Sequence, residues 1–225
     1  MLNVTARQDL MRTIVETVNV VVEEARLDFS ENGLEIRVVD PSHVAMIQMK
    51  IDSAAFDTWD VSDIKLGLEI KKLKEMVSLA AAGELIHLNY SEDIGNLTLN
   101  IGKIDRNIRP LDNSTLSPPN LPKLELPCEV KISGDALAQA FRAAMMVGDL
   151  VNLSIDENKF VVSVSGGTDS VVVEYDGDDV ESISCDSPTR SQYSLTYLIP
   201  LAKVFNSLGT ITLQFGENLP LQTEV

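Results

Sequence analysis

The 225-residue sequence has few of the side chains that bind metals or staple small folds, with only two cysteines and two histidines. Cys128 and Cys185 are too few and too far apart to predict a metal site or a disulfide framework. A reduced, intracellular setting is therefore expected. His43 and His87 are also distant from each other, with no third histidine or cysteine at ligand spacing, so no metal site is predicted.

Long apolar runs are missing as well. No stretch approaches the roughly 18 apolar residues that a membrane span needs. The opening residues MLNVTARQDLMRT include Asp9 and lack an unbroken apolar block, so they are not expected to be a signal peptide. A hydrophobic content of 44% is typical of a folded chain with its own core.

Positive charge is scarce. The chain has 18 lysines and arginines against 34 acidic residues, for a net charge of −16. A simple nucleic-acid binder is usually basic, so the total argues against that class of protein. The other reading of the charge is a well-solvated acidic surface.

Motifs that could support catalysis are weak. SGGTDS at residues 165–170 resembles a phosphate-binding loop, but a β-branched run follows it, which favours a tight turn between strands. The acidic run DGDDVE at 176–181 lacks the ordered ligands of a calcium loop. No nucleophile and base can be paired, so we predict no enzymatic activity and no cofactor. A nucleotide-hydrolysing enzyme using residues 165–170 stays open as an alternative.

One pattern occurs twice in the chain. Residues 28–38 read DFSENGLEIRV, and residues 154–164 read SIDENKFVVSV. Each combines an alternating apolar run, a Glu-Asn turn and a second alternating run, which is typical of a β-hairpin. The same hairpin at equivalent points of two halves indicates repeated architecture.

Helical spacing of apolar residues also recurs in both halves. Amphipathic helices are predicted at residues 7–22, 69–80, 134–146 and 197–207. Thr5 and Ser133 are the expected N-caps of the first and third helices. Pro200 is expected in the first turn of the fourth, where its missing N–H is tolerated. Equivalent elements recur at offsets of 125 to 128 residues, which indicates an internal duplication.

The predicted fold is α+β, with two similar domains that each place two helices on one face of a β-sheet layer. The segment RNIRPLDNSTLSPPNLPKLELP between the halves is proline-rich and has no usable periodicity. It is expected to be an extended linker. The predicted boundaries are 1–109 for the first domain, 110–127 for the connector and 128–225 for the second domain.

Charge is distributed unevenly between these elements. The predicted helices carry seven basic and five acidic residues, whereas the rest of the chain carries 11 basic and 29 acidic ones. Chance and the helix propensity of Lys and Arg are one explanation. The other is a helical face that presents cations to a polyanion while the acidic remainder repels nucleic acid. Contacts to phosphate alone would not read sequence and would weaken as salt rises.

One segment resembles a known family. Residues 33–51, GLEIRVVDPSHVAMIQMKI, resemble the Asp-x-Ser-His-Val segment of the archaeal and eukaryotic DNA sliding clamp, proliferating cell nuclear antigen. The segments RAAMMVGDLVNLSID and ITLQFGENLPLQTEV and the proline-bearing linker support the match in order. The resemblance covers essentially the whole chain, and the duplication matches the family's two-domain subunit.

The resemblance implies a non-enzymatic DNA polymerase processivity factor, active in replication and repair and located in the cytoplasm or nucleoid of an archaeon or in a nucleus. Three subunits would form a ring, with helices lining a hole through which duplex DNA passes. Polymerase, clamp loader, ligase and nuclease would bind one face through short peptides, and no membrane is involved. Whether the ring is a homotrimer or contains related chains stays open, as does a trimeric scaffold that does not encircle DNA.

The resemblance also assigns residues to three surfaces. The DNA-facing residues would be Arg7, Arg12, Lys71, Lys74, Arg142 and Lys203. The client-peptide pocket would contain Val39, His43, Val44, Met46, Leu121, Pro122 and Pro220. The subunit interface would contain Lys103, Arg106, Ile108, Val171 and Val173. Several basic positions of other clamps are Thr13, Asn19, Glu75 and Ser78 here, which implies a weaker hold on DNA.

The last residues depart from the family pattern. The family's second domain continues beyond PLQTEV into a further strand and a tail, and the segment IGKIDRNIRPL of the first half has no partner at the end of the second. The chain is therefore expected to be shorter by about 20 residues. A weakened client pocket and an incomplete inter-domain sheet would follow.

Overall fold

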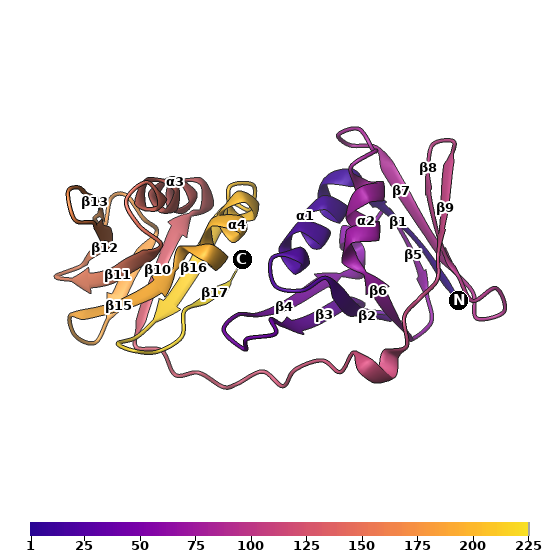
Figure 1. Ribbon diagram of the computed structural model, residues 1–225, viewed down its shortest axis with the longest axis horizontal. Helices are drawn as coiled ribbons and strands as arrows, with labels where there is room; N and C mark the ends of the chain where they lie inside the picture. The colour runs from indigo at the N-terminus through magenta and orange to yellow at the C-terminus, as the bar shows by residue number, and fades with distance from the viewer. Residues whose placement is uncertain (225) are drawn as a thin grey trace. The chain divides into compact units, whose positions relative to one another are not determined.

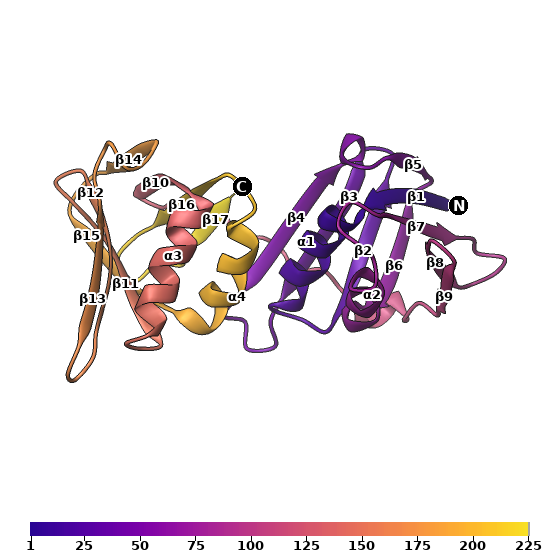
Figure 2. The ribbon, with the colours of Figure 1, turned by 90° about the horizontal axis from the view of Figure 1, so that it is seen from above.

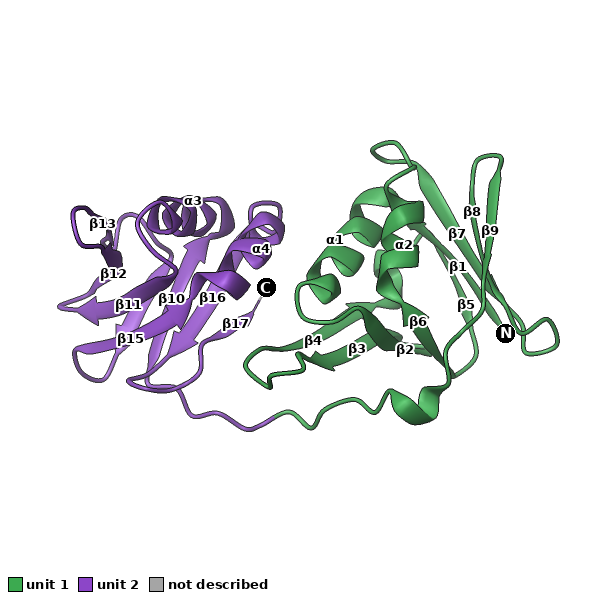
Figure 3. Ribbon diagram, viewed as in Figure 1, with its two compact units in different colours: residues 1–121 green, residues 122–225 purple. Residues whose placement is uncertain are grey.

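The computed structural model describes residues 1–224, and the chain divides into two compact units, residues 1–121 and residues 122–225 (Figure 3). Each unit contains two antiparallel sheets and two helices that lie side by side (Figures 1 and 2). Among residues 1–224, no helix is long and apolar enough to cross a membrane.

Unit 1 holds a five-stranded and a four-stranded sheet, in the orders β5-β1-β7-β8-β9 and β4-β3-β2-β6. Its strands are β1 (Leu2–Arg7), β2 (Glu24–Ser30), β3 (Gly33–Val39), β4 (Met46–Asp52), β5 (Thr58–Val61), β6 (Ile64–Glu69), β7 (Leu85–Tyr90), β8 (Leu97–Ile101) and β9 (Ile104–Ile108). Its helices are α1 (Gln8–Asn19) and α2 (Ile70–Val77), with short 3-10 turns η1 (Ser53–Ala55) and η2 (Asn113–Thr115).

Unit 2 holds two four-stranded sheets, in the orders β14-β10-β16-β17 and β13-β12-β11-β15. Its strands are β10 (Cys128–Ser133), β11 (Leu150–Asp156), β12 (Lys159–Ser165), β13 (Ser170–Tyr175), β14 (Ser182–Cys185), β15 (Thr189–Ser194), β16 (Thr210–Phe215) and β17 (Gln222–Glu224). Its helices are α3 (Gly134–Met145) and α4 (Leu195–Phe205).

The two units repeat the same order of elements. A strand, a helix, five strands, a second helix and two further strands follow one another in each, and β9 is the additional strand of unit 1. This order confirms the predicted α+β duplication. Strand residues alternate between buried and accessible, and each helix turns one apolar face to the sheets. Fully buried residues such as Leu137 and Phe141 of α3 each contribute about 1.5–3 kcal/mol of burial free energy.

The two hairpins that repeat in the sequence use different turns. Glu157 and Asn158 both adopt positive φ, 47° and 65°, as a two-residue hairpin turn with the right-handed strand twist requires. In unit 1 the positive φ falls on Gly33 at 143°. A Cβ atom on Gly33 would lie 2.0 Å from the carbonyl oxygen of Ile51, so that strand position needs glycine.

Two expectations about helix ends are wrong, and one is confirmed. Thr5 lies inside β1, and α1 begins after Arg7 with no side-chain cap, because the strand continues almost to the helix. Pro200 lies in the interior of α4, since this helix is capped by Ser194 and begins at Leu195, two residues before the predicted start. Ser133 caps α3 as predicted, with its hydroxyl accepting from the backbone N–H of Ala136.

The expectation about the cysteines is also wrong. Cys128 and Cys185 form a disulfide, although 57 residues separate them in sequence. The reason is strand register: β10 and β14 pair antiparallel so that these two residues are direct partners, with Cα atoms 4.2 Å apart. The disulfide ties the edge strand β14 to its neighbour β10.

Candidate nucleic-acid and peptide interfaces

Three exposed basic residues lie on the two helices of unit 1. Arg12 of α1 and Lys71 of α2 are exposed and form no ion pair with residues 1–224. Lys74 is also exposed, and its ammonium group donates to Asn19 Oδ1 at 3.3 Å, which links α2 to the end of α1. Arg7 lies just before α1 and faces Asp57 at 3.7 Å.

Acidic neighbours neutralise other cations near α2. Lys72 Nζ lies 2.5 Å from Glu69 Oε1, and Arg106 of β9 lies 2.9 Å from Glu75 Oε2. Arg106 also donates to the Lys72 carbonyl oxygen, so it holds α2 against the edge strand β9. Among residues 1–224, these pairs leave Arg12 and Lys71 as the cations of the two helices without an ion pair, with Lys74 held by an amide.

Unit 2 places one cation on each helix. Arg142 of α3 and Lys203 of α4 are exposed and form no ion pair within the described chain. Arg142 shares the exposed stripe of α3 with Asp135, Gln139 and Met146, the last 82% exposed. The Ser133 hydroxyl donates to the Asp135 carboxylate, and this hydrogen bond lowers the pKa of Asp135. Asp135 therefore remains an acceptor at the N-terminus of α3, where the helix dipole favours negative charge.

A buried carboxylate shapes the loop between β3 and β4. Asp40 is only 4% exposed, and its two oxygens accept backbone N–H groups of Ser42, Val44 and Ala45 at 2.7–3.0 Å. The Asp40 N–H itself donates to the Ala45 carbonyl. This closed loop directs Val44 outward, 67% exposed, beside His43 with its positive φ of 56°.

Four of the seven predicted pocket residues come together on the β3–β4 hairpin. Val39 and Met46 are direct cross-strand partners, and His43 and Val44 lie in the turn between them. Leu121 and Pro122 lie on the stretch 116–126, which forms neither helix nor strand, and Pro220 lies in the loop between β16 and β17. The turn of the hairpin presents an exposed apolar side chain and an exposed imidazole beside each other.

The predicted interface residues lie on two edge strands. β9 ends one sheet of unit 1, and β13 ends one sheet of unit 2. Ile108 is 3% exposed and belongs to the core of its unit, and Val171 and Val173 pack partly against the core of theirs. The exposed apolar side chains on these edges are Ile104, at 47%, and Val172, at 60%.

The weak motifs form ordinary local structure. SGGTDS is the turn between β12 and β13, where the Gly166 N–H donates to the Asp169 carbonyl. Carboxylates of Asp176 and Asp179 accept backbone N–H groups of their own loop. No group of three or more His, Cys, Asp or Glu side chains within residues 1–224 could hold a metal ion.

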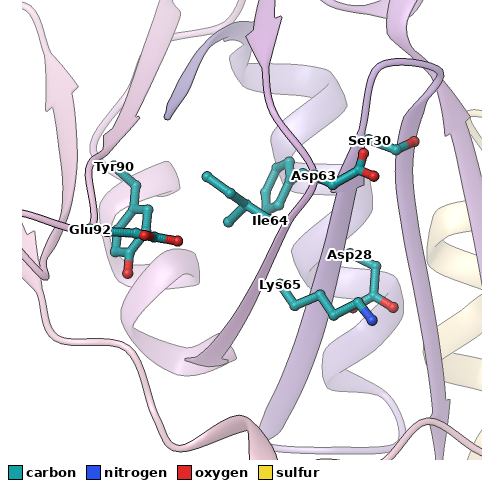
Figure 4. Close-up of a pocket in the computed structure, with 8 residues that line it drawn as sticks. Asp28, Ser30, Asp63, Ile64, Lys65, Tyr90 and Glu92 are labelled. Carbon is teal, nitrogen blue, oxygen red and sulfur yellow. The ribbon is translucent and has the colours of Figure 1, made fainter.

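A polar cavity of about 380 Å³ opens between β2, β6 and the end of β7 (Figure 4). Asp28, Asp63, Lys65 and Glu92 line it. Two guanidinium nitrogens of Arg26 donate to the two Asp28 oxygens at 2.7 and 2.8 Å, and this hydrogen bonding raises the pKa of Arg26. Asp28 is thus already paired, and the cavity contains none of the predicted site residues.

Two repeated units, each with two helices over two antiparallel sheets and with cations on exposed helix faces, define the DNA clamp class. A family model described as "Proliferating cell nuclear antigen, N-terminal domain" matches residues 1–113. The DNA polymerase sliding clamp of Methanosphaerula palustris is 33% identical over 225 residues, covering 99% of this chain and 91% of the relative. The chain belongs to the proliferating cell nuclear antigen family of DNA polymerase sliding clamps.

Other relatives agree with this assignment. The DNA polymerase sliding clamp of Haloarcula marismortui is 30% identical, with the same coverage of both chains. The structure of A. fulgidus PCNA bound to the C-terminal region of FEN-1 matches with a TM-score of 0.93 and 26% identity over 99% of this chain and 91% of that one. PCNA from Thermococcus kodakaraensis shares the fold at a TM-score of 0.90 and 17% identity, over 99% of this chain and 93% of that one. The resemblance, the fold class and the non-enzymatic function predicted from the sequence are confirmed.

Three residues that the structure makes prominent on these elements were not singled out from the sequence. Ile104 and Val172 were not among the predicted interface residues. Ile104 lies between Lys103 and Asp105, and an apolar residue between polar neighbours on an edge strand could have indicated it. Val172 lies between Val171 and Val173 and offers no such signal. Asp40 was identified only as part of a motif. An Asp that precedes Pro-Ser is typical of a side-chain-capped turn and could have indicated its role.

Proposed function

We propose that this protein is a processivity factor whose ring of three copies encircles duplex DNA and tethers replication and repair proteins to it. The observation that carries the proposal is the separation of charge. The four helices hold six basic and four acidic residues, whereas the rest of the chain holds 12 basic and 30 acidic ones. Cations on helices would attract phosphate, and the acidic remainder would repel DNA from every other surface.

DNA would be held loosely by this arrangement. Arg12, Lys71, Arg142 and Lys203 are long, exposed and free of acidic partners within the described chain, so they can contact phosphates. Arg7 and Lys74 would add contacts at the cost of their present partners. Phosphate contacts carry no sequence information, which suits a protein that slides.

Ring closure would use the two edge strands. Free N–H and C=O groups along β9 of one subunit would pair with those along β13 of the next, and Ile104 and Val172 would be covered at the same time. Lys103, Arg106, Ile108, Val171 and Val173 lie on or beside these strands. Such a head-to-tail contact generates a ring when its rotation closes.

Client proteins would bind the β3–β4 hairpin together with the connector. The A. fulgidus clamp with the C-terminal region of FEN-1 supports a peptide mode of binding. Val39, His43, Val44 and Met46 would contact an apolar anchor, with Leu121, Pro122 and Pro220 as further contributors. The clients would be DNA polymerase, clamp loader, ligase and nuclease, in the compartment that contains the chromosome.

Two measurements test the proposal: the mass of the assembly in solution and its retention on circular compared with linear DNA. Light scattering should give three times the 24.6 kDa subunit mass. After loading by a clamp loader, the protein should remain on closed circular DNA and be lost when the circle is cut, because it can then slide off an end. The double variant Arg142→Glu/Lys203→Glu should be retained less at moderate salt, since two phosphate contacts per subunit become repulsive.

A control variant tests whether the loss of retention depends on where the charge is changed or only on the net charge of the protein. The double variant Lys50→Glu/Lys159→Glu removes two exposed cations from strands β4 and β12 and makes the same change of net charge. Its retention should equal that of the wild type. A trimer that is lost equally from circular and linear DNA would instead support the alternative, a scaffold that does not encircle DNA, which the net charge of −16 favours.

A further inference from the structure

The edge strand β6 is partly covered by the first residues of the connector. β6 is the last strand of its sheet, so carbonyl groups on its outer side face no further strand. The Leu111 N–H donates to the Gly67 carbonyl at 2.8 Å, and Leu111 forms an isolated antiparallel bridge with Gly67. Asn113 Nδ2 donates to the Lys65 carbonyl at 2.6 Å. Two carbonyl groups of β6 therefore accept hydrogen bonds from the connector. Without it they would accept from solvent or from another chain.

Glycine at position 67 makes this close approach possible. A Cβ atom there would lie 2.8 Å from Leu116 Cδ1, 3.1 Å from Asn113 Oδ1 and 3.1 Å from the Leu111 carbonyl oxygen. Three groups of the connector thus occupy the space that any larger residue would need. Lys65, the neighbouring contact, directs its own side chain to the polar cavity on β2 and β6 (Figure 4).

The turn η2 gives the contact its shape. Asp112 Oδ1 accepts the Ser114 N–H at 2.9 Å, which lowers the pKa of Asp112, and the Thr115 hydroxyl donates to the Asp112 carbonyl. This capped turn places Asn113 and Leu116 on the same side, against Gly67. Asn113 Oδ1 is buried there and accepts no hydrogen bond from residues 1–224. Its amide geometry is specific, because a carboxylate at that position would bury a charge and lose the donor to Lys65.

We propose that Gly67, Asn113 and Leu116 form a latch that fixes the start of the connector and thereby increases the affinity of the clamp for client peptides. The inference rests on the proposed function, since it assigns a positioning role within the proposed client site. Residues 116–126 have neither helix nor strand, and Leu121 and Leu124 of this stretch are exposed. Ordering such a chain against a peptide costs conformational entropy, and a fixed end reduces the number of residues that remain to be ordered.

The latch is tested with Asn113→Asp and Gly67→Ala, which open it from its two sides. Deuterium uptake at residues 111–121 should rise in both variants, while uptake in β1, β7 and the helices stays unchanged. A fluorescent peptide with the sequence of the FEN-1 C-terminal region should bind about 3- to 10-fold more weakly, the effect of losing one net hydrogen bond. Ser117→Ala, an exposed substitution on the same stretch, is the matched control and should behave as the wild type.

The outcomes separate the latch from the function that it serves. If the wild type binds the peptide and both variants bind it equally well, the latch has no positioning role. Unchanged deuterium uptake at 111–121 in both variants would overturn the latch itself. A wild type that does not bind the peptide at all would contradict the proposed client site instead, and the role assigned to the latch would fail with it. Increased uptake together with weaker peptide binding supports the proposal.

Discussion

At the scale of single residues, a few polar side chains determine where the functional groups lie. Asp40 uses both carboxylate oxygens to collect backbone N–H groups, and the loop that results exposes Val44. Ser133 caps α3 and lowers the pKa of Asp135. Because that pKa is lowered, the stabilisation is present above the ordinary aspartate value and is lost as the pH falls through the folded value. Asp40 and Ser133 thus each fix the backbone beside them.

Replacing Asp40 should therefore impair peptide binding, although the buried Asp40 side chain would not itself contact the peptide. Asn at position 40 substitutes an N–H donor for one acceptor, so one of the three backbone N–H groups loses its partner. We expect the free energy of unfolding to fall by about 1–3 kcal/mol and the affinity for the FEN-1 peptide to fall several-fold. Denaturant unfolding and peptide titration measure the two effects. Asp93→Asn, an exposed carboxylate in the β7–β8 turn, is the control, and wild-type affinity in Asp40→Asn would contradict the role.

At the scale of elements, the edge strands are the features with the largest consequences. β9 and β13 are edge strands, as are β4, β5, β14, β15 and β17, whereas the edge of β6 is partly covered by the connector. Uncovered edges invite pairing with another chain, and covered ones prevent it. The edges of β9 and β13 are therefore available for the subunit contact proposed above.

Reduction of the Cys128–Cys185 disulfide should destabilise unit 2. The cross-link spans 57 residues, a loop for which about 2–4 kcal/mol of stabilisation is typical. Thermal unfolding of the oxidised protein should shift to lower temperature with a thiol reductant, and the double variant Cys128→Ala/Cys185→Ala should not respond to it. The intact mass measured under non-reducing conditions should be lower than that of the reduced protein by two hydrogen atoms. Alkylation of both thiols in the native, unreduced protein would show that the prediction is wrong.

At the scale of the whole molecule, assembly and charge act together. In the proposed ring, an acidic exterior would keep DNA away from each subunit, so binding would depend on enclosure rather than on tight local contact. A ring held by edge strands would then determine how long the protein remains on DNA. The weak cationic set on the helices is consistent with sliding.

A charged residue in the centre of a proposed edge contact should open the ring. Val172→Lys places an ammonium group on β13, where pairing with β9 would bury it. Light scattering should give the subunit mass of 24.6 kDa or a mixture of smaller species in place of a trimer. Val161→Lys makes the same change on β12, one strand further in and on the same face of the sheet, and should leave the assembly intact. An intact Val172→Lys trimer would exclude this edge as the interface.

Much of the fold was predictable because its signals are local. Alternating apolar residues and Glu-Asn turns predicted both hairpins, and helical spacing predicted all four helices within a few residues of their ends. The helix ends were less predictable: Thr5 belongs to a strand, and Pro200 lies inside α4. At these two ends, the pairing of β1 and the Ser194 cap determine where the helix begins. The spacing of apolar residues encodes neither of them.

The sequence predicted which residues are candidates for the sites better than it predicted how these residues are arranged on a surface. Arg12, Lys71, Arg142 and Lys203 were expected on exposed helix faces, and they are exposed. The ion pair between Arg106 and Glu75 and the burial of Ile108 were not foreseen. Each depends on which distant segment lies alongside, and no short pattern in the sequence reports this.

The sequence by itself determined the doubled order of elements, the apolar faces of the helices and the excess of acid outside them, because periodicity and charge are properties of neighbouring residues. Only the tertiary structure decided which cations stay unpaired, which strands remain edges, how Cys128 meets Cys185 and where the connector meets Gly67. These features depend on strand register and packing between residues tens of positions apart, and a shift of one residue would change every one of those partners.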